Sequence, residues 1–471
     1  MAEKISFDTI PGALRVPGQY IEFNTRTAVQ GLPQNPQKLL ILGPMTAGGK
    51  QPALTPVQLY SDAQAGDLFG QGSWAQAMVK QVFSNNAYLD VTVIGVPDHE
   101  AGVAAVGSVV VSGKSTSAGA VDLIIGGVEY SIAVPAGISA EAVADKLRAK
   151  LTASPACLVA GGGSGATLSL TAKNKGEIGN EISVKVQSGA AGLNFKVTAM
   201  ANGQKNANIS EALAVVAGKQ YHVVVCPFVD DANAKALSTH LTDVSNAIEQ
   251  RGCIGVLGWR GTLATGIAFA AKINDGRATC AWYKGAVEGN ALIAAGYAAQ
   301  LAAEQDPAKP LNTLEVRGLT VTPDADWPLF AECNNALFNG MTPLTVVNNK
   351  VQIMRAVSTY TKSAANVDDP SLLDITTIRT LDYTRKAVKE RIALRFPRSK
   401  LSDTLVPKVK SEVLDVLIKL EEAEIIENAE ANKGKLQMVR AENDPNRLNA
   451  VIPADVVNGL HVFAGRIDLI L

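Results

Sequence analysis

The chain has 471 residues, which predicts about three domains or one large core with additions. Hydrophobic residues make up 47% and charged residues only 18%, below the usual share of about 25%. With 43 Lys and Arg against 44 Asp and Glu, the net charge is -1. This balance excludes the long-range field that draws a protein onto polyanions, so we expect no nucleic-acid partner.

The first residues contain no apolar core for export, and no later stretch reaches the roughly 18 continuous apolar residues of a membrane span. We therefore expect a soluble protein made in the cytoplasm, without direct membrane insertion. Histidine is scarce, which leaves little material for general acid–base chemistry. The cysteines are odd in number and lack metal-ligand spacing, so neither disulfides nor zinc are expected. They are Cys157, Cys226, Cys253, Cys280 and Cys333.

Residues 1–36 are predicted to form an extended N-terminal arm. A long helix is opposed by Pro11, Gly12, Pro17, Gly18, Pro33 and Pro36. The segment 20–24 alternates polar and apolar residues, as a strand does.

An α/β core is predicted for residues 37–97 and 219–370. Short apolar runs of the kind that parallel sheets bury occur at 39–42, 91–96, 221–226, 253–257 and 278–282. Helical patterns at 231–250 and 262–273 alternate with the last three runs, which is typical of a βαβαβ unit. Cys226, Cys253 and Cys280 are assigned to its buried core, one per strand.

Residues 98–218 differ from the core because they contain no tryptophan and only Tyr130 and Phe195 as aromatic residues. Glycine turns separate five predicted strands, and one helix is expected from a Ser139 cap to Leu151. Gly161–Gly165 is interpreted as a flexible hairpin tip. We expect an inserted β-rich outer domain.

Residues 371–459 are predicted to be an α+β domain, and residues 460–471 a C-terminal strand arm. Charged helices are expected at 375–396 and 407–428, followed by strands that end at 460–463 and 467–471. The first helix is basic, and an acidic run extends from Glu421 to Glu430.

Two patterns invite an enzymatic interpretation. Gly43–Lys50 follows a strand but lacks the first glycine and the final Ser or Thr of a phosphate loop, so a plain turn is favoured. The carboxyl ends of the core strands carry charged residues, where open α/β sheets bind ligands. These are Asp230, Asp231, Arg260 and Lys284. Asp231 and Thr262 occupy positions expected of helix N-caps, and neither a nucleophile elbow nor a partnered histidine accompanies the cluster, so helix caps and solvated loop charges are preferred.

In order along the chain, several segments resemble the tail sheath protein of contractile-tailed bacteriophages, in the Mu-like branch. They are Val16–Phe23, Leu170–Asn180, Val357–Thr361, Thr376–Tyr383 and Arg391–Phe396. The resemblance implies a structural subunit that polymerises as a helical sheath around an inner tail tube and contracts to drive the tube through the bacterial envelope. It also implies an α/β domain like subtilisin in fold only, with no catalytic, metal or cofactor residues. The alternative is a soluble α/β hydrolase-like enzyme with an added β module.

The resemblance further implies particular partners and places. The partners are further copies of the chain, the tail tube protein, and the baseplate and tail terminator proteins. The expected locations are the virion tail and, during assembly, the host cytoplasm.

The terminal arms are expected to join subunits by adding strands to a neighbour's sheet. The residues assigned to these contacts are Tyr20, Ile21, Phe23, Val462, Phe463, Ile467, Leu469 and Leu471. The C-terminal domain is expected to face the tube, because its charges are segregated. Arg385, Lys386 and Lys389 are the tube-facing candidates, and the acidic run is the alternative.

Overall fold

The computed structural model describes residues 16–21 and 31–470 of the chain. Residues 35–383 and 456–470 form a larger compact unit, while residues 16–21, 31–34 and 384–455 form a smaller one. Within the described ranges, no helix has the length and apolar character needed to cross a membrane.

An eight-stranded mixed sheet is the centre of the larger unit, with strand order β15-β14-β13-β12-β11-β1-β3-β2. Its strands are β1 (Lys38–Met45), β2 (Pro56–Leu59), β3 (Asp90–Pro97), β11 (Val223–Val225), β12 (Ile254–Trp259), β13 (Ala278–Trp282), β14 (Thr342–Val347) and β15 (Lys350–Ile353). The six inner strands run parallel, with Leu39 opposite both Val91 and Val223, and the two edge strands are antiparallel. The predicted parallel-rich α/β sheet is confirmed.

Helices cover both faces of this sheet. The two glycines Gly255 and Gly258 of β12 face different helices and so identify the two sides. The helices of this unit are α1 (Asp62–Phe69), α2 (Trp74–Asn85), α4 (Ser210–Val216), α5 (Asp231–Ser245), α6 (Leu263–Ile273), α7 (Asn290–Ala303) and α8 (Phe330–Phe338), besides one in the inserted domain. A side chain at Gly255 would meet Leu237 of α5, whereas one at Gly258 would meet Ile293 of α7. Because alternate residues of a strand point to opposite faces, α5 and α7 lie on opposite sides of the sheet.

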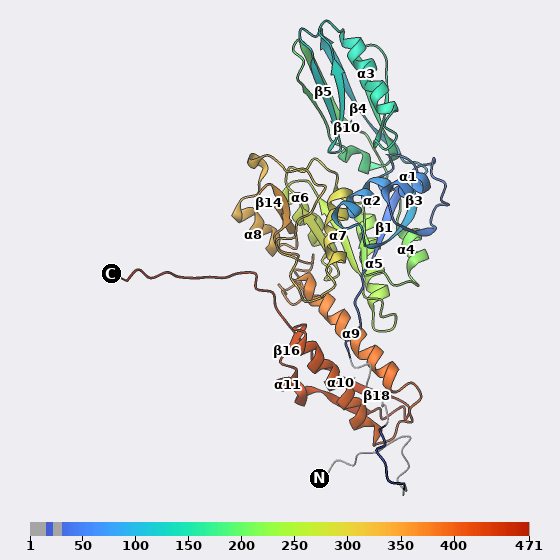
Figure 1. Cartoon of the computed structure of the whole chain (residues 1–471), viewed down its shortest axis with the longest axis vertical. Helices are drawn as coiled ribbons and strands as arrows, with labels where there is room; N and C mark the ends of the chain where they lie inside the picture. The colour runs from blue at the N-terminus through green and yellow to red at the C-terminus, as the bar shows by residue number, and fades with distance from the viewer. Residues whose placement is uncertain (1–15, 22–30, 471) are drawn as a thin grey trace. The chain divides into compact units, whose positions relative to one another are not determined.

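Residues between β3 and α4 form a β-rich domain inserted in the larger unit, and Figure 1 shows its strands β4, β5 and β10 together with helix α3 at one end of that unit. One sheet has the order β10-β4-β8-β7 and the other the order β6-β5-β9. The strands are β4 (Ala104–Gly113), β5 (Gly119–Ile125), β6 (Val128–Val134), β7 (Val159–Gly162), β8 (Thr167–Lys175), β9 (Val184–Ser188) and β10 (Leu193–Ala201), and the helix is α3 (Ala140–Thr152). The predicted cap is confirmed, since the Ser139 side chain accepts a hydrogen bond from the Ala142 amide.

Several elements were not predicted, for physical reasons that the structure makes plain. Gly161 and Gly162 belong to strand β7, and the hairpin turn to β8 follows them. Strand β10 is an exposed edge strand that was not predicted, although Leu193, Phe195 and Val197 alternate with polar residues along it. Helix α5 ends at Ser245, because the Asn246 side chain accepts hydrogen bonds from the next amides and diverts the chain into a turn.

The smaller unit consists of helices with short strands. Helix α9 (Ile375–Arg395) begins in the larger unit and ends in the smaller one, and α10 (Leu405–Glu422), β16 (Ile426–Glu427), α11 (Ala429–Asn432), β17 (Gln437–Arg440) and β18 (Leu448–Val451) follow. Helix α10 is shorter than predicted, because Glu424 adopts a left-handed φ of 55° and the Ile425 amide bonds back to the Leu420 carbonyl. That bond is the mark of a Schellman helix end.

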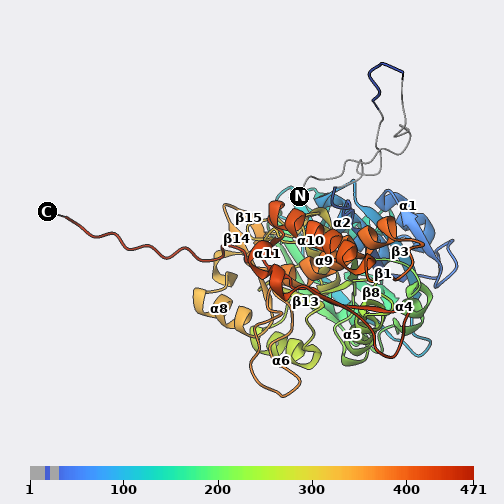
Figure 2. The same cartoon turned by 90° about the horizontal axis from the view of Figure 1, so that it is seen from below.

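The last described residues do not form the predicted strands within the chain. After β19 (Asp455–Val456), residues 457–470 adopt no regular secondary structure. Both views show this C-terminal segment running away from the larger unit as an extended chain (Figures 1 and 2). A strand needs a partner for its backbone groups, and this segment meets none in its own chain that the structure describes.

Candidate functional site

The charged residues at the carboxyl ends of the core strands form structural contacts. Asp230, and not Asp231, caps α5 by accepting from the Asn233 amide at 3.0 Å. Asp231 pairs with Lys272 at 2.8 Å, and Lys284 pairs with Glu332 at 2.9 Å. Arg260 donates to the backbone carbonyl of Glu181 in the inserted domain. Thr262 caps α6 as predicted, so these residues have the structural roles that the sequence favoured.

The cysteines lie inside the protein, and all five are free and buried. Burial raises the pKa of the Cys226 and Cys253 thiols to about 12, so both are protonated at neutral pH and poor nucleophiles. No group of three or more His, Cys, Asp or Glu side chains in the described residues is placed to hold a metal ion.

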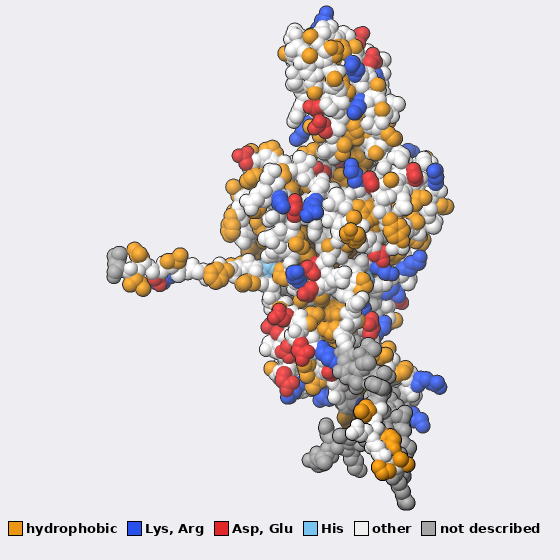
Figure 3. All heavy atoms as spheres, in the orientation of Figure 1, with side chains coloured by type: hydrophobic (Ala, Val, Ile, Leu, Met, Phe, Trp, Pro, Cys, Tyr) orange, Lys and Arg blue, Asp and Glu red, His pale blue; other side chains and the backbone are white. Residues whose placement is uncertain are grey.

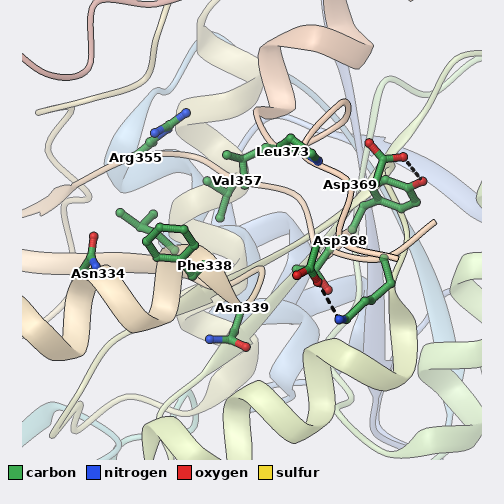
Figure 4. Close-up of a pocket in the computed structure, with 13 residues that line it drawn as sticks. Asn334, Phe338, Asn339, Arg355, Val357, Asp368, Asp369 and Leu373 are labelled. Carbon is green, nitrogen blue, oxygen red and sulfur yellow. Dashed lines mark hydrogen bonds and ion pairs between the residues drawn. The ribbon is translucent and has the colours of Figure 1, made fainter. Parts of the chain in front are cut away.

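A pocket of about 590 Å³ lies between α8 and the loop that follows β15 (Figure 4). Phe338, Val357 and Leu373 contribute its apolar lining. Its charged side chains are engaged with one another or with neighbouring groups: Lys362 with Asp368 at 2.6 Å, the Tyr360 hydroxyl with Asp369 at 2.7 Å, and Arg355 with Asp374 at 2.7 Å. The pocket presents an apolar surface, and its charged side chains are paired. This arrangement suits contact with another apolar surface better than catalysis of a reaction.

The outer segment of the C-terminal arm, residues 462–470, presents apolar side chains to solvent. Every one of its residues is exposed, and Figure 3 shows hydrophobic side chains along it. The exposed fractions are 77% for Val462, 87% for Phe463, 99% for Ile467 and 82% for Leu469. Of the other predicted arm residues, Tyr20 and Ile21 are exposed, while Phe23 and Leu471 lie outside the described residues.

The tube-facing candidates lie on helix α9 in the smaller unit. Lys389 is exposed, whereas Lys386 donates to the Gln34 carbonyl at 2.6 Å and Arg385 is half-buried. Arg391 of the same helix is buried and binds Glu412 and Asp415 of α10. Of the three candidates, Lys389 is therefore the exposed one, while Arg385 and Lys386 are half-buried.

Glu181 is a half-buried residue that the sequence did not single out. Its carboxylate accepts from the Asn290 amide and from Asn290 Nδ2, both at 2.8 Å, and so caps α7, whose N-cap residue Gly289 has no side chain to do so. Burial raises the pKa of Glu181 to about 7, against the opposing effects of Asn290 and Arg260. A capping residue 109 positions away leaves no local pattern to read.

Comparisons with known proteins agree with this arrangement. The model of the phage tail sheath protein central domain matches residues 202–359, and that of the phage tail sheath C-terminal domain matches residues 367–470. The Mu-like prophage FluMu tail sheath protein of Haemophilus influenzae is 34% identical over 486 residues, covering 99% of this chain and 100% of the relative.

One solved structure supports the fold. The sheath tail protein Lin1278 from Listeria innocua superposes with a TM-score of 0.52 at 12% identity, over 92% of this chain and 95% of that one. The sheath tail protein DSY3957 from Desulfitobacterium hafniense gives 0.49 at 14% identity, over 90% and 93%. The hydrolase alternative finds no support in these comparisons. The chain belongs to the phage tail sheath protein family and is a structural subunit of a phage tail sheath.

Proposed function

We propose that this subunit polymerises through its terminal arms into a helical sheath around the tail tube, and that the sheath contracts to drive the tube through the bacterial envelope. Membership of the family implies the helical assembly around a tube and a place in the virion tail. The observation that carries the proposal is the exposed, apolar, unpaired C-terminal arm. Head-to-tail contacts of this kind do not close on themselves, and therefore generate helical polymers.

The domains take separate roles in this proposal. Residues 37–97 and 219–370 are the sheath core, whose likeness to subtilisin is one of fold without chemistry. Residues 98–218 are the outer domain and residues 371–459 the tube-facing domain. Residues 1–36 and 460–471 are the arms. The ends of the sheath contact the baseplate and tail terminator proteins, and assembly takes place in the host cytoplasm.

A two-stranded hairpin in the smaller unit supplies a receiving edge for an arm. Strands β17 and β18 pair only with each other among the described residues, from Gln437 opposite Val451 to Arg440 opposite Leu448. Most of their side chains are exposed, including Val439 and Val451 at 60% each. An isolated two-stranded ribbon is marginally stable, so added strands from neighbouring subunits would complete it.

Truncation of the arm tests the proposal. A chain that ends at His461 should remain a folded monomer with an unchanged unfolding midpoint, because residues 462–470 are exposed, but it should form no tubes in negative-stain microscopy. Arg466→Ala is the matched control, since it removes an exposed polar side chain from the same arm and should assemble. Tubes formed by the truncated chain at wild-type yield would overturn the role of the arm.

Charge reversal at the exposed lysine tests the tube contact. Lys389→Glu should impair assembly on purified tail tubes while sparing tube-free polysheath, because exposed ion pairs contribute only about 0 to 1 kcal/mol each but repeat along the tube. The control is Lys408→Glu, an exposed lysine on α10. Normal assembly of Lys389→Glu on tubes at low salt would move the contact to the acidic run, where Glu422→Lys is the corresponding variant.

A further inference from the structure

The C-terminal arm has a defined root at His461. Its side chain is only 13% exposed, whereas Leu460 and Val462 on either side are 82% and 77% exposed. Beyond it, every described residue to 470 is exposed. His461 is therefore the last described residue whose side chain is largely covered, and the residues after it extend into solvent.

Two segments of the larger unit contact that ring, and a third supports one of them. His461 Nδ1 lies 2.9 Å from Asn312 Nδ2, and Nε2 lies 3.5 Å from Asp374 Oδ1. Arg355 grips the same Asp374 carboxylate through two hydrogen bonds of 2.8 and 2.7 Å. Asn312 lies in the loop after α7 and Asp374 directly precedes α9, so the ring contacts two separate segments of the fold, and Arg355 after β15 supports one of them.

The hydrogen-bond roles follow from the partners. Because Asn312 Nδ2 is a donor, Nδ1 of the ring accepts, and the proton of the neutral imidazole belongs on Nε2, which lies 3.5 Å from Asp374 Oδ1 without forming a hydrogen bond. Burial and the charge of Arg355 lower the pKa of His461, against the opposing charge of Asp374, so the ring is neutral at neutral pH. Asp374 keeps its orientation because the planar Arg355 fork fixes both carboxylate oxygens.

We propose that His461 is a positioning residue that fixes where and in which direction the C-terminal arm leaves the core, so that the arm reaches the sheet of a second copy of this chain in the correct register. This inference rests on the proposed function of the arm. Nine residues span at most about 30 Å when extended, and a slip of one residue turns every side chain to the wrong face. A fixed root also raises the effective concentration of the arm at the neighbouring sheet.

A spin label at Val462→Cys reports the mobility of the arm directly beside His461. All five native cysteines are buried, so the label goes to the introduced thiol. His461→Ala should increase the mobility of the label and slow tube formation by about tenfold or more, through the lost effective concentration. His461→Gln, which keeps an acceptor for Asn312, should give intermediate values. His99→Ala is the matched control, because His99 is exposed and lies in the inserted domain.

The outcomes separate this inference from the proposed function. If the chain ending at His461 assembles, the arm proposal fails. Suppose instead that this chain does not assemble, but that His461→Ala matches the wild type in label mobility and in assembly rate. The positioning role of His461 is then overturned, and the arm proposal stands. Should His461→Ala lose its circular dichroism spectrum, Asn312→Ala makes the same test from the other side of the ring, with increased mobility and slower assembly expected.

Discussion

The inserted domain and the C-terminal arm are both attached to the same core, but by opposite means. At the inserted domain the junction is buried and polar: Asn174, 1% exposed, bonds to the Met45 carbonyl, the Trp74 amide and Asp98. Nearby, Glu181 caps α7. Past the His461 ring, the arm is exposed and apolar.

The inserted domain is attached by contacts that the chain makes with itself, whereas the apolar side chains of the arm need a surface from outside the chain to cover them. Buried polar groups must be paired, and at the inserted domain the chain supplies the partners itself. Exposed apolar side chains on an extended segment gain their stabilisation only when another surface covers them. We therefore expect substitutions at the junction to alter the stability of the single subunit, and substitutions in the arm to alter assembly alone.

The largest expected loss is at Asn174. Asn174→Ala removes hydrogen bonds from two buried backbone groups, the Met45 carbonyl and the Trp74 amide, and from the half-buried Asp98, which should lower the free energy of unfolding by about 4 kcal/mol. Urea denaturation of the unassembled subunit measures it. Asn194→Ala, on the exposed edge strand β10, is the matched control and should change the free energy by less than about 0.5 kcal/mol. Equal effects for the two variants would contradict a polar junction.

The next effect is a pH dependence from Glu181. Its pKa of about 7 in the folded chain exceeds the usual 4.5, so the folded state binds the proton more tightly. This contribution to stability is complete below about pH 4.5 and is lost as the pH rises through 7, a change on the order of 3 kcal/mol. Glu181→Gln should remove that slope between pH 5 and 8.

The control for that slope is Glu177→Gln, an exposed carboxylate at the start of the same short helix, which should leave it unchanged. Denaturation midpoints across the pH range decide the matter. A slope that persists in Glu181→Gln would assign the titration to another group.

A smaller effect is expected at Ser183. Its hydroxyl donates to the Val287 carbonyl of the core at 2.8 Å. Ser183→Ala should cost about 1 kcal/mol, the value of one hydrogen bond at a half-buried site. Thermal unfolding compares it with Ser131→Ala, which loses a hydroxyl from an exposed site within the inserted domain. A larger loss of stability for Ser131→Ala than for Ser183→Ala would contradict a stabilising role for the half-buried hydrogen bond at the junction.

The smallest effect on the single subunit is expected in the arm. Phe463→Ala removes a side chain that is 87% exposed, so the free energy of unfolding should change by less than about 0.5 kcal/mol. Sedimentation of the assembled material should nevertheless show fewer tubes. A clear loss of subunit stability would mean that the arm packs on its own chain.

The sequence by itself predicted the parts of this protein whose signals are local. The buried runs around Leu39, Val91, Ile254 and Cys280 form the parallel strands, and Ser139 and Thr262 cap helices where expected. The order of motifs along the chain indicated the tail sheath family, which the family models and the full-length relative confirm. Periodicity and capping need only neighbours in sequence, so they can be read without a fold.

Tertiary structure alone decided what distant residues do together. Helix α7 is buried almost all round and rich in alanine, so no amphipathic stripe marks it. The Glu181 cap joins residues 109 apart, and the His461 ring meets Asn312 across 149 positions. Arg391 looked like part of a basic surface but is buried between two carboxylates of α10. The charge of a side chain is evident from the sequence, whereas its partner depends on which helices and strands the fold brings close to it.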